Sequence, residues 1–340
     1  MRKYSRLLIG LAVSAFFLYF VVRGLDLHAV RFWLSQANYW WILPGVLIYF
    51  VGVWLRTWRW QYMLRPIKVM TVPHLFPIVC IGYMGNNIFP VRAGEVLRSY
   101  VLKRTDDVSM SASLATIVVE RVFDGLVMLL FVFFALPFAP MPPELRVYVV
   151  GASIFFLTAL MIFIVLATRP DTTQRLYRST FRRFLPENMR NKVDGLIERF
   201  LEGLHFFRNS RDVVMVFFTS VLIWLAETVK YWFVMQGFVQ LGGGFPVPFF
   251  VLMLMNGIVN LATTIPSAPG YVGTFDTPGV AVLAAYGVDR ELAFGYTIVL
   301  HAALWFPITI LGAWYFRRER LAWSDVDAAR AQRSQSVEVA

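Results

Sequence analysis

Long apolar stretches separated by short polar segments dominate the sequence. Runs with few or no charged residues recur at 7–22, 32–55, 69–91, 125–143, 147–168, 231–275 and 292–316. Each is close to or above the ~17–25 residues that a helix needs to cross a bilayer. The alternating segments of roughly ten residues that are typical of membrane β-barrel strands are absent. The pattern therefore predicts an all-α polytopic membrane protein.

The apolar pattern predicts about six transmembrane helices, at about 7–23, 40–56, 111–136, 146–168, 212–238 and 291–316. A single integral membrane domain is expected over residues 1–320. Within it, 169–211 places apolar residues at helical spacing, which predicts a cytoplasmic amphipathic segment that serves either as a connector or as a gate. The polar residues 321–340 are expected to form a disordered cytoplasmic tail.

Composition supports this class and orients the chain. Of the 340 residues, 58% are hydrophobic and 16% are charged, and the mean hydropathy is +0.60, which is too apolar for a soluble protein. Most of the 32 Lys and Arg residues lie in 1–6, 56–68, 92–104, 169–211 and 317–340. The positive-inside rule explains the net charge of +11 without nucleic acid. It places both termini in the cytoplasm, and we expect a multi-pass protein of the bacterial inner membrane.

Two apolar segments do not fit as single crossings. Residues 56–68 and 92–104 are both basic and prefer the same side, so 72–104 is predicted to enter the membrane and return as a re-entrant hairpin. The same reasoning makes 246–288 a second re-entrant hairpin from the opposite face. Non-helical backbone at this depth requires a protein or water environment. The alternative counts the hairpin arms as full crossings, which gives eight spans or more.

The two hairpins share a pattern of helix-breaking residues. Asparagines precede a proline and then a glycine four positions later, as Asn86, Asn87, Pro90 and Gly94 in the first hairpin and as Asn256, Asn260, Pro266 and Gly270 in the second. Proline and glycine leave half-helices whose ends point into the protein. The match predicts an inverted repeat, an arrangement common in transporters.

Charged and polar residues inside the apolar stretches are the candidate site. Such a charge costs roughly 2.5 kcal/mol or more at the bilayer centre, so it usually serves a pathway or a bound polar group. A helix that begins near Ala93, flanked by Arg92 and Arg98, suits a phosphate-bearing headgroup. The predicted substrate-binding residues are Asn86, Asn87, Arg92, Glu95, Arg98, Glu120, Arg121, Asp124, Asn260 and Asp276.

Structural explanations remain open for the same residues. Arg92, Glu95 and Arg98 could form salt bridges on a cytoplasmic loop. Glu120 and Asp124 share one helix face, and they could pair with one of these arginines to close the hairpin. Glu227 and Lys230 are three residues apart and either neutralise each other or act in gating or proton coupling.

Other residues point away from catalysis. The lone Cys80 fits packing, and His301 is expected to be a hydrogen-bonded packing residue. We find no zinc-ligand spacing, no phosphate-binding glycine loop and no hydrolase elbow in the sequence. We therefore expect a protein that is not an enzyme, with no metal and no cofactor.

The motifs together resemble a known family. Asn86-Asn87-x-x-Pro90-x-Arg92-x-Gly94-Glu95-x-x-Arg98, Glu120-Arg121-x-x-Asp124 and Asn260 with Pro266-x-x-Pro269-Gly270-x-x-Gly273 are similar to the lysylphosphatidylglycerol synthase transmembrane-region family, also called UPF0104. The resemblance covers about 5–316 and implies a flippase-like protein that handles lipids. Family members that make lysyl-lipid carry a synthase domain after the membrane part. Because this sequence ends soon after its last predicted span, we expect no lipid synthesis.

The resemblance and the residues together predict a lipid flippase. It would move a phospholipid, an aminoacyl-phospholipid or a polyprenyl-phosphate-linked lipid across the membrane. The alternatives are a membrane-embedded transferase that acts on a lipid-linked substrate and a non-transporting partner of a lipid-modifying enzyme. The expected ligand is a membrane lipid headgroup, nucleic acid is not expected, and a homodimer is compatible with the sequence.

Overall fold

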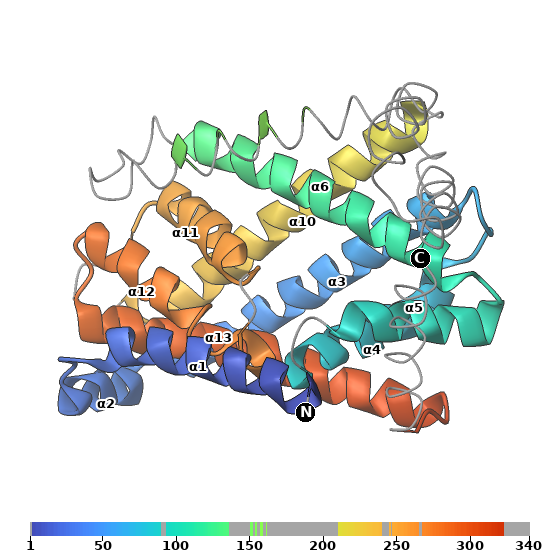
Figure 1. Cartoon of the computed structure of the whole chain (residues 1–340). Helices are drawn as coiled ribbons and strands as arrows, with labels where there is room; N and C mark the ends of the chain where they lie inside the picture. Colours follow the sequence, from blue (N-terminus) through green and yellow to red (C-terminus); the bar gives the residue numbers. More distant parts are fainter. Residues whose placement is uncertain are drawn as a thin grey trace, which may run out of the picture.

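The computed structural model describes residues 2–89, 93–135, 210–239, 245, 247–264 and 267–322, together with 150, 151, 154, 157, 158 and 161. The described residues form helices joined by short turns and contain no strand (Figure 1). The helices are α1 (Arg2–Val22), α2 (Leu27–Gln36), α3 (Ile42–Leu64), α4 (Val72–Ile88), α5 (Ala93–Asp106), α6 (Met110–Ala135), α10 (Ser210–Gln236), α11 (Phe249–Ala262), α12 (Asp276–Ala285) and α13 (Arg290–Arg318). The chain is thus an all-α polytopic membrane protein.

Three described helices are long and apolar enough to cross a membrane. They cover Tyr39–Leu64, Arg211–Gln236 and Arg290–Arg318, and Gly10–Val22 with Leu27–Gln36 is a fourth if this pair, bent by 87°, counts as one span. Helix α6 has 26 residues, but it carries three charged side chains in its middle. The outer faces of the helices expose large apolar side chains such as Leu47, Phe134 and Ile310, which suits contact with lipid tails.

Helices α4 and α5 form the first hairpin. They are antiparallel, because Gly85 lies against Gly94 near the break while Gly82 lies against Arg98 one turn further out. At the outer end, His74 at the start of α4 contacts Asp106 at the end of α5 at 2.9 Å. Both arms therefore return to the same end of the molecule, as the sequence predicted.

The second hairpin, α11 and α12, enters from the other end (Figure 1). Helix α10 runs from one end of the molecule to the other, so the contacts at its two termini show which hairpin lies at which end. Asp212 at its start lies 3.7 Å from Arg65, next to the first hairpin. Phe238 just after its end packs on Tyr296 near the start of α13, and Tyr296 also packs on Phe245, which precedes α11. The hairpins thus approach the middle of the protein from opposite ends.

The packing follows the inverted repeat. Each half consists of a long helix, a hairpin and a second long helix: α3, α4–α5 and α6 in one half, and α10, α11–α12 and α13 in the other. The first long helices, α3 and α10, pack together. The hairpin of each half packs on the last helix of the other, so that α4 lies on α13 and α11 lies on α6. Gly312 meets Cys80, and Gly257 meets Val132, at these two contacts.

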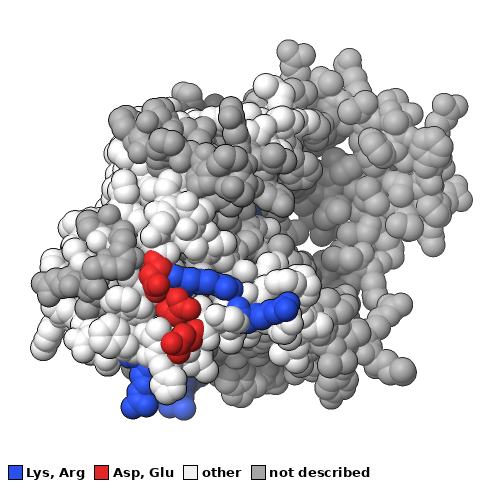
Figure 2. All heavy atoms as spheres, turned by 90° about the vertical axis from the view of Figure 1, so that its left-hand side faces the viewer, with Lys and Arg blue, Asp and Glu red and all other residues white. Residues whose placement is uncertain are grey.

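The two ends differ in charge. Figure 2 shows the end formed by α2, the start of α13 and the outer part of the second hairpin, where a few acidic and basic side chains lie among white atoms. There Asp26 N–H donates to Glu291 Oε1 at 3.2 Å, and Arg290 donates to the Phe20 carbonyl at 2.9 Å. The basic segments that the structure describes, 56–68 and 93–104, end at the opposite side.

One predicted boundary was wrong. The span predicted at 40–56 continues as α3 to Leu64, so Arg56 and Arg59 lie inside the helix. Ion pairs with carboxylates on α6 and α10 make this possible, as described below. The predictions for 146–168, 169–211 and 321–340 lie outside the described residues, apart from the scattered positions in 150–161, the first two residues of α10, and 321–322.

Candidate functional site

A cavity lies where the two hairpin tips meet. It encloses about 870 Å³, mouth included. Asn86 and Asn87 from the end of α4 line one side, and Asn260 and Gly270 from the second hairpin line another. The tips share α13 as a support, because Trp305 Nε1 donates to the Asn87 carbonyl at 3.4 Å and Asn87 Nδ2 donates to Thr309 Oγ1 at 2.8 Å.

An arginine, a glutamate and a lysine form the polar wall on α3 and α10. Arg56 donates to Glu227 Oε1 at 2.9 Å, and Lys230 pairs with Glu227 Oε2. The Lys230 ammonium also lies 4.8 Å from the Tyr49 ring centre, within cation–π range. Glu227 and Lys230 form the ion pair expected under the first of the two alternatives, and Arg56 adds a second cation to it. This wall therefore carries one positive charge in excess.

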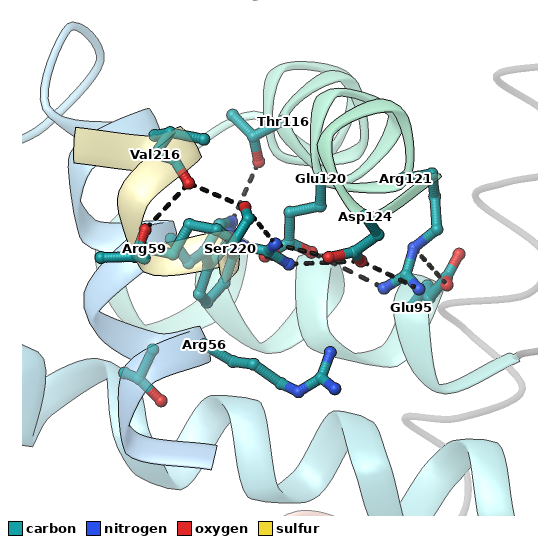
Figure 3. A network of polar contacts seen from close by, with 12 residues as sticks. Arg56, Arg59, Glu95, Thr116, Glu120, Arg121, Asp124, Val216 and Ser220 are labelled. Carbon is teal, nitrogen blue, oxygen red and sulfur yellow. Dashed lines mark hydrogen bonds and ion pairs between the residues drawn. The ribbon is translucent and has the colours of Figure 1, made fainter. Parts of the chain in front are cut away.

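Arg121 supplies a further cation from α6. Its Nε lies 3.7 Å from Glu95 Oε1 on α5, and its side chain is 42% exposed. Glu95 and Arg121 both line the cavity. Figure 3 shows Arg121 and Glu95 at one edge of the polar network and Arg56 extending away from it. Arg121 is thus open to a ligand in a way that the other arginines of this network are not.

Behind the cavity wall, α3, α5 and α6 share a buried network of ion pairs (Figure 3). Arg59 Nη1 donates to Asp124 Oδ1 at 2.5 Å and to Ser220 Oγ at 2.8 Å. Trp224 Nε1 donates to the same carboxylate at 3.1 Å. Arg98 donates to Glu120 Oε2 at 2.7 Å. The two arginines and two carboxylates balance, which is the condition for keeping such charges away from water.

Arg98 is held by packing as well as by charge. Its guanidinium lies 4.2 Å from the Trp60 ring centre, and its side chain is 8% exposed. Trp60 in turn donates through Nε1 to Thr116 Oγ1 on α6 at 2.9 Å. This arrangement matches the structural alternative, in which Glu120 pairs with an arginine of the first hairpin and closes it onto α6.

In the second hairpin, a histidine and an aspartate join α13 to the chain break. His301 Nδ1 lies 2.8 Å from Asp276 Oδ1, and Nε2 lies 2.7 Å from the Gly270 carbonyl oxygen. Asp276 Oδ2 accepts the Gly273 N–H at 2.8 Å. Gly270 belongs to a short 3₁₀ turn, Pro269–Tyr271, and has φ +74°. Its Cα approaches the Trp305 indole so closely that a Cβ would lie 2.7 Å from Nε1.

The predicted site residues divide into two groups. Those that line the cavity are Asn86, Asn87, Glu95, Arg121, Glu227, Lys230 and Asn260. Those that lie behind its wall are Arg98, Glu120, Asp124 and Asp276. Arg92, Pro90 and Pro266 lie outside the described residues. Among the described residues, no group of three His, Cys, Asp or Glu side chains is arranged to hold a metal ion.

Sequence reasoning missed Arg56 and Arg59 because it assigned them to a cytoplasmic loop. The side chain of Arg59 is 1% exposed, and that of Arg56 is 11% exposed. A usable signal was present, since each buried arginine has a carboxylate on an apolar helix elsewhere in the chain. His301, expected as a packing residue, is hydrogen-bonded as predicted, but it also lines the cavity.

Comparison with known families gives a match that covers most of the chain. Residues 7–312 match the family described as the lysylphosphatidylglycerol synthase TM region. This range includes every residue of the candidate site and both hairpins.

Individual relatives are distant but extend over nearly the whole chain. A UPF0104 membrane protein of Methanocaldococcus jannaschii is 22% identical over 91% of this chain and 94% of its own length. A UPF0104 membrane protein of Methanothermobacter thermautotrophicus is 25% identical over 87% and 91%. The glycosyltransferase AglD of Haloferax volcanii is 26% identical over 89% of this chain, which corresponds to 52% of that protein.

Proposed function

Because this chain belongs to the lysylphosphatidylglycerol synthase transmembrane-region family, we propose that it is a flippase that moves a phosphate-bearing lipid across the cytoplasmic membrane. The headgroup enters the central cavity while the acyl chains stay in the bilayer. The observation that carries the proposal is a cavity inside a membrane protein, lined by cations and reached by both hairpin tips.

The charges of the cavity favour an anionic headgroup. Arg56, Arg121 and Lys230 face two carboxylates, Glu95 and Glu227, which leaves one positive charge in excess. A phosphodiester carries one negative charge and offers oxygens that a guanidinium binds in a bidentate manner. Asparagines at the tips supply neutral donors and acceptors for hydroxyl, ammonium or ester groups.

Among the described arginines, Arg121 is the best placed to hold the phosphate. Its side chain is the most exposed of the network. It lies near three carboxylates, Asp124 at 3.5 Å, Glu120 at 3.9 Å and Glu95 at 3.7 Å, and each distance, including that of the contact with Glu95 in the cavity, is longer than a hydrogen bond. A phosphate oxygen can therefore replace or join that contact. Arg98, by contrast, is occupied by Glu120 and Trp60, so its role is to position the first hairpin.

The rival function is a membrane-embedded transferase that acts on a lipid-linked substrate. The relative named glycosyltransferase AglD is the observation that favours it. The two functions differ in outcome, because a flippase changes the position of a lipid and a transferase changes its structure.

Reconstitution into liposomes that contain a panel of labelled phospholipids and polyprenyl phosphates tests the proposal. The parent protein should move at least one of these lipids between leaflets without altering it. Arg121→Gln should slow this movement at least tenfold, since loss of one charge-assisted contact is worth about 1.5–3 kcal/mol. A new lipid product would favour the transferase.

A matched control is available at the end of α3. Arg65→Gln removes an arginine whose side chain is 41% exposed, almost as exposed as that of Arg121, and which lies 3.7 Å from a carboxylate, that of Asp212. Arg65 does not line the cavity. Its replacement should leave lipid movement unchanged. Equal rates for the Arg121→Gln variant and the parent would remove the proposed headgroup role.

A further inference from the structure

His301 occupies a position where its protonation decides whether two elements stay attached to α13. One ring nitrogen contacts the carboxylate that begins α12, and the other contacts the carbonyl of the Pro269–Tyr271 turn. The ring lies 4.5 Å from that of Phe275, and the His301 and Asp276 side chains are 15% and 6% exposed. A single side chain of α13 therefore contacts both the turn and the start of α12.

Both contacts need a proton. A peptide carbonyl only accepts hydrogen bonds, so Nε2 must carry hydrogen to bond Gly270. A carboxylate oxygen and an unprotonated Nδ1 are both acceptors, so a further proton must lie between Nδ1 and Asp276. It makes no difference to this count on which of the two atoms that proton resides. The observed geometry is thus the geometry of the protonated pair.

We propose that the His301–Asp276 pair is a proton-binding site that couples the second hairpin, and hence the transport function proposed above, to the proton concentration. When the imidazolium returns its proton to water, neutral imidazole and carboxylate remain. The ring then has one N–H for two acceptors. One of the two contacts is lost, and either the turn at Gly270 or the start of α12 is released from α13.

Release of the Gly270 turn or of the start of α12 from α13 changes the wall of the headgroup cavity directly. Gly270, Tyr271, Phe275 and His301 all line it. The Gly270 turn also packs on Trp305, which holds the carbonyl of Asn87 in the tip of the first hairpin. The proton on His301 therefore stabilises the junction between the two hairpins. Its loss opens the cavity wall on the side of the second hairpin.

The other ionisable side chains near His301 explain why His301, and not one of them, exchanges the proton. The other ionisable groups that line the same cavity are Tyr49, Arg56, Tyr83, Glu95, Arg121, Glu227, Lys230 and Tyr271. Arg56 and Lys230 already share Glu227. Arginine stays protonated at any physiological pH, and histidine is the side chain suited to exchange a proton in this range.

The proposed release of the Pro269–Tyr271 turn from α13 can be tested without lipid transport, by measuring how accessible the turn is to a reagent in water. In a Cys80→Ala background, the half-buried Ala268 is replaced by cysteine and its rate of reaction with a water-soluble maleimide is measured. The rate should rise about tenfold more than thiol ionisation explains between about pH 5 and about pH 9. The same cysteine combined with His301→Gln should show only the change due to the thiol.

The proton stoichiometry is measured in liposomes that contain a pH-sensitive dye. Lipid movement by the parent should be accompanied by proton movement and should follow an imposed pH gradient. His301→Gln should move lipid, if it moves it at all, without proton flux. His74→Gln is the matched control, because His74 also contacts an aspartate, Asp106, but at the molecular surface outside the cavity. It should leave both readouts unchanged.

The outcomes separate the two proposals. If the parent moves no lipid, the flippase function fails, and the labelling experiment still tests whether the turn is released when His301 loses its proton. If labelling or proton flux is the same with His301 and with Gln at this position, the proton site is refuted. Should the His301→Gln variant not fold, Asp276→Asn replaces it. A neutral amide can satisfy neutral imidazole, so its labelling should also lose the dependence on pH.

Discussion

The two halves of the protein hold their hairpins by different chemistry. In the first half, α5 is joined to α6 by the Arg98–Glu120 pair, which belongs to a buried network with Arg59 and Asp124. In the second half, the Asp276–His301 pair joins α12 to α13, and it is the one ion pair between these two helices within the described residues. The backbone arrangement is repeated and inverted, while the polar contacts are not repeated.

This difference assigns different roles to the two halves. Guanidinium–carboxylate pairs stay charged over the whole physiological pH range. The ion pairs that hold the first hairpin therefore do not change with pH, and this hairpin keeps its position. A histidine pair exchanges a proton, so the second hairpin is the element that can move. The inverted repeat brings two equivalent positions to the middle of the protein, and we propose that one is used for rigidity and the other for response.

The largest expected effect comes from breaking the fixed half. Asp124→Asn leaves the buried Arg59 without its closest counter-charge. Removing one partner of a buried pair typically costs about 3–5 kcal/mol of unfolding free energy. The midpoint of thermal unfolding in detergent should fall clearly below that of the parent. Asp276→Asn should cost only about 1 kcal/mol, because neutral imidazole can still bond the amide.

A double variant separates the effect of an unpaired buried charge from the effect of a changed side-chain volume and shape. Replacing both partners, as Arg59→Met with Asp124→Leu, removes the uncompensated charge together with the pair and should recover most of the lost stability. Equal unfolding midpoints for Asp124→Asn and Asp276→Asn would show that the two halves are held by contacts of similar strength, contrary to the comparison.

A smaller effect is expected from the glycines at the hairpin contacts. A Cβ on Gly94 would lie 1.9 Å from the Gly82 carbonyl oxygen and 2.4 Å from the Asn86 nitrogen. Because these neighbours are backbone, Gly94→Ala should separate the arms of the first hairpin and cost roughly 2–3 kcal/mol. The unfolding midpoint of this variant measures that cost.

Gly279→Ala is the corresponding change in the second hairpin. Its Cβ would lie 2.9 Å from Met255 Cε, the end of a flexible side chain, and 3.1 Å from Thr297 Cγ2, so neither of its two close contacts is with backbone. Methionine adapts readily, so the cost should stay below about 1 kcal/mol. If Gly279→Ala proved as destabilising as Gly94→Ala, the second hairpin would be packed as rigidly as the first.

Much of the fold could be predicted from the sequence. The length of the apolar stretches located α6, α10 and α13 to within a few residues. The distribution of Lys and Arg predicted that 72–104 returns to the side from which it starts, because two basic segments cannot easily lie on opposite faces. Matched helix breaks identified the inverted repeat.

The pairing inside the site could not be predicted in the same way. Charge counting grouped Arg56 and Arg59 with Arg65 and Lys68, so all four were assigned to a cytoplasmic segment at 56–68. Only the fold brings the first two to Glu227 and Asp124, which lie far away in the sequence. The sequence likewise could not place Gly270 next to His301, because a carbonyl oxygen has no residue-specific signal.

The direction from which each hairpin enters is the claim on which the cavity depends, and paired cysteine accessibility in intact membranes measures it. In a Cys80→Ala background, cysteines at the exposed positions Lys68 and Arg104 should react with an impermeant reagent from one face, and cysteines at Pro248 and Ala285 from the other. Labelling of Lys68→Cys and Arg104→Cys from opposite faces would mean that α4 and α5 do not return together, and it would contradict the account.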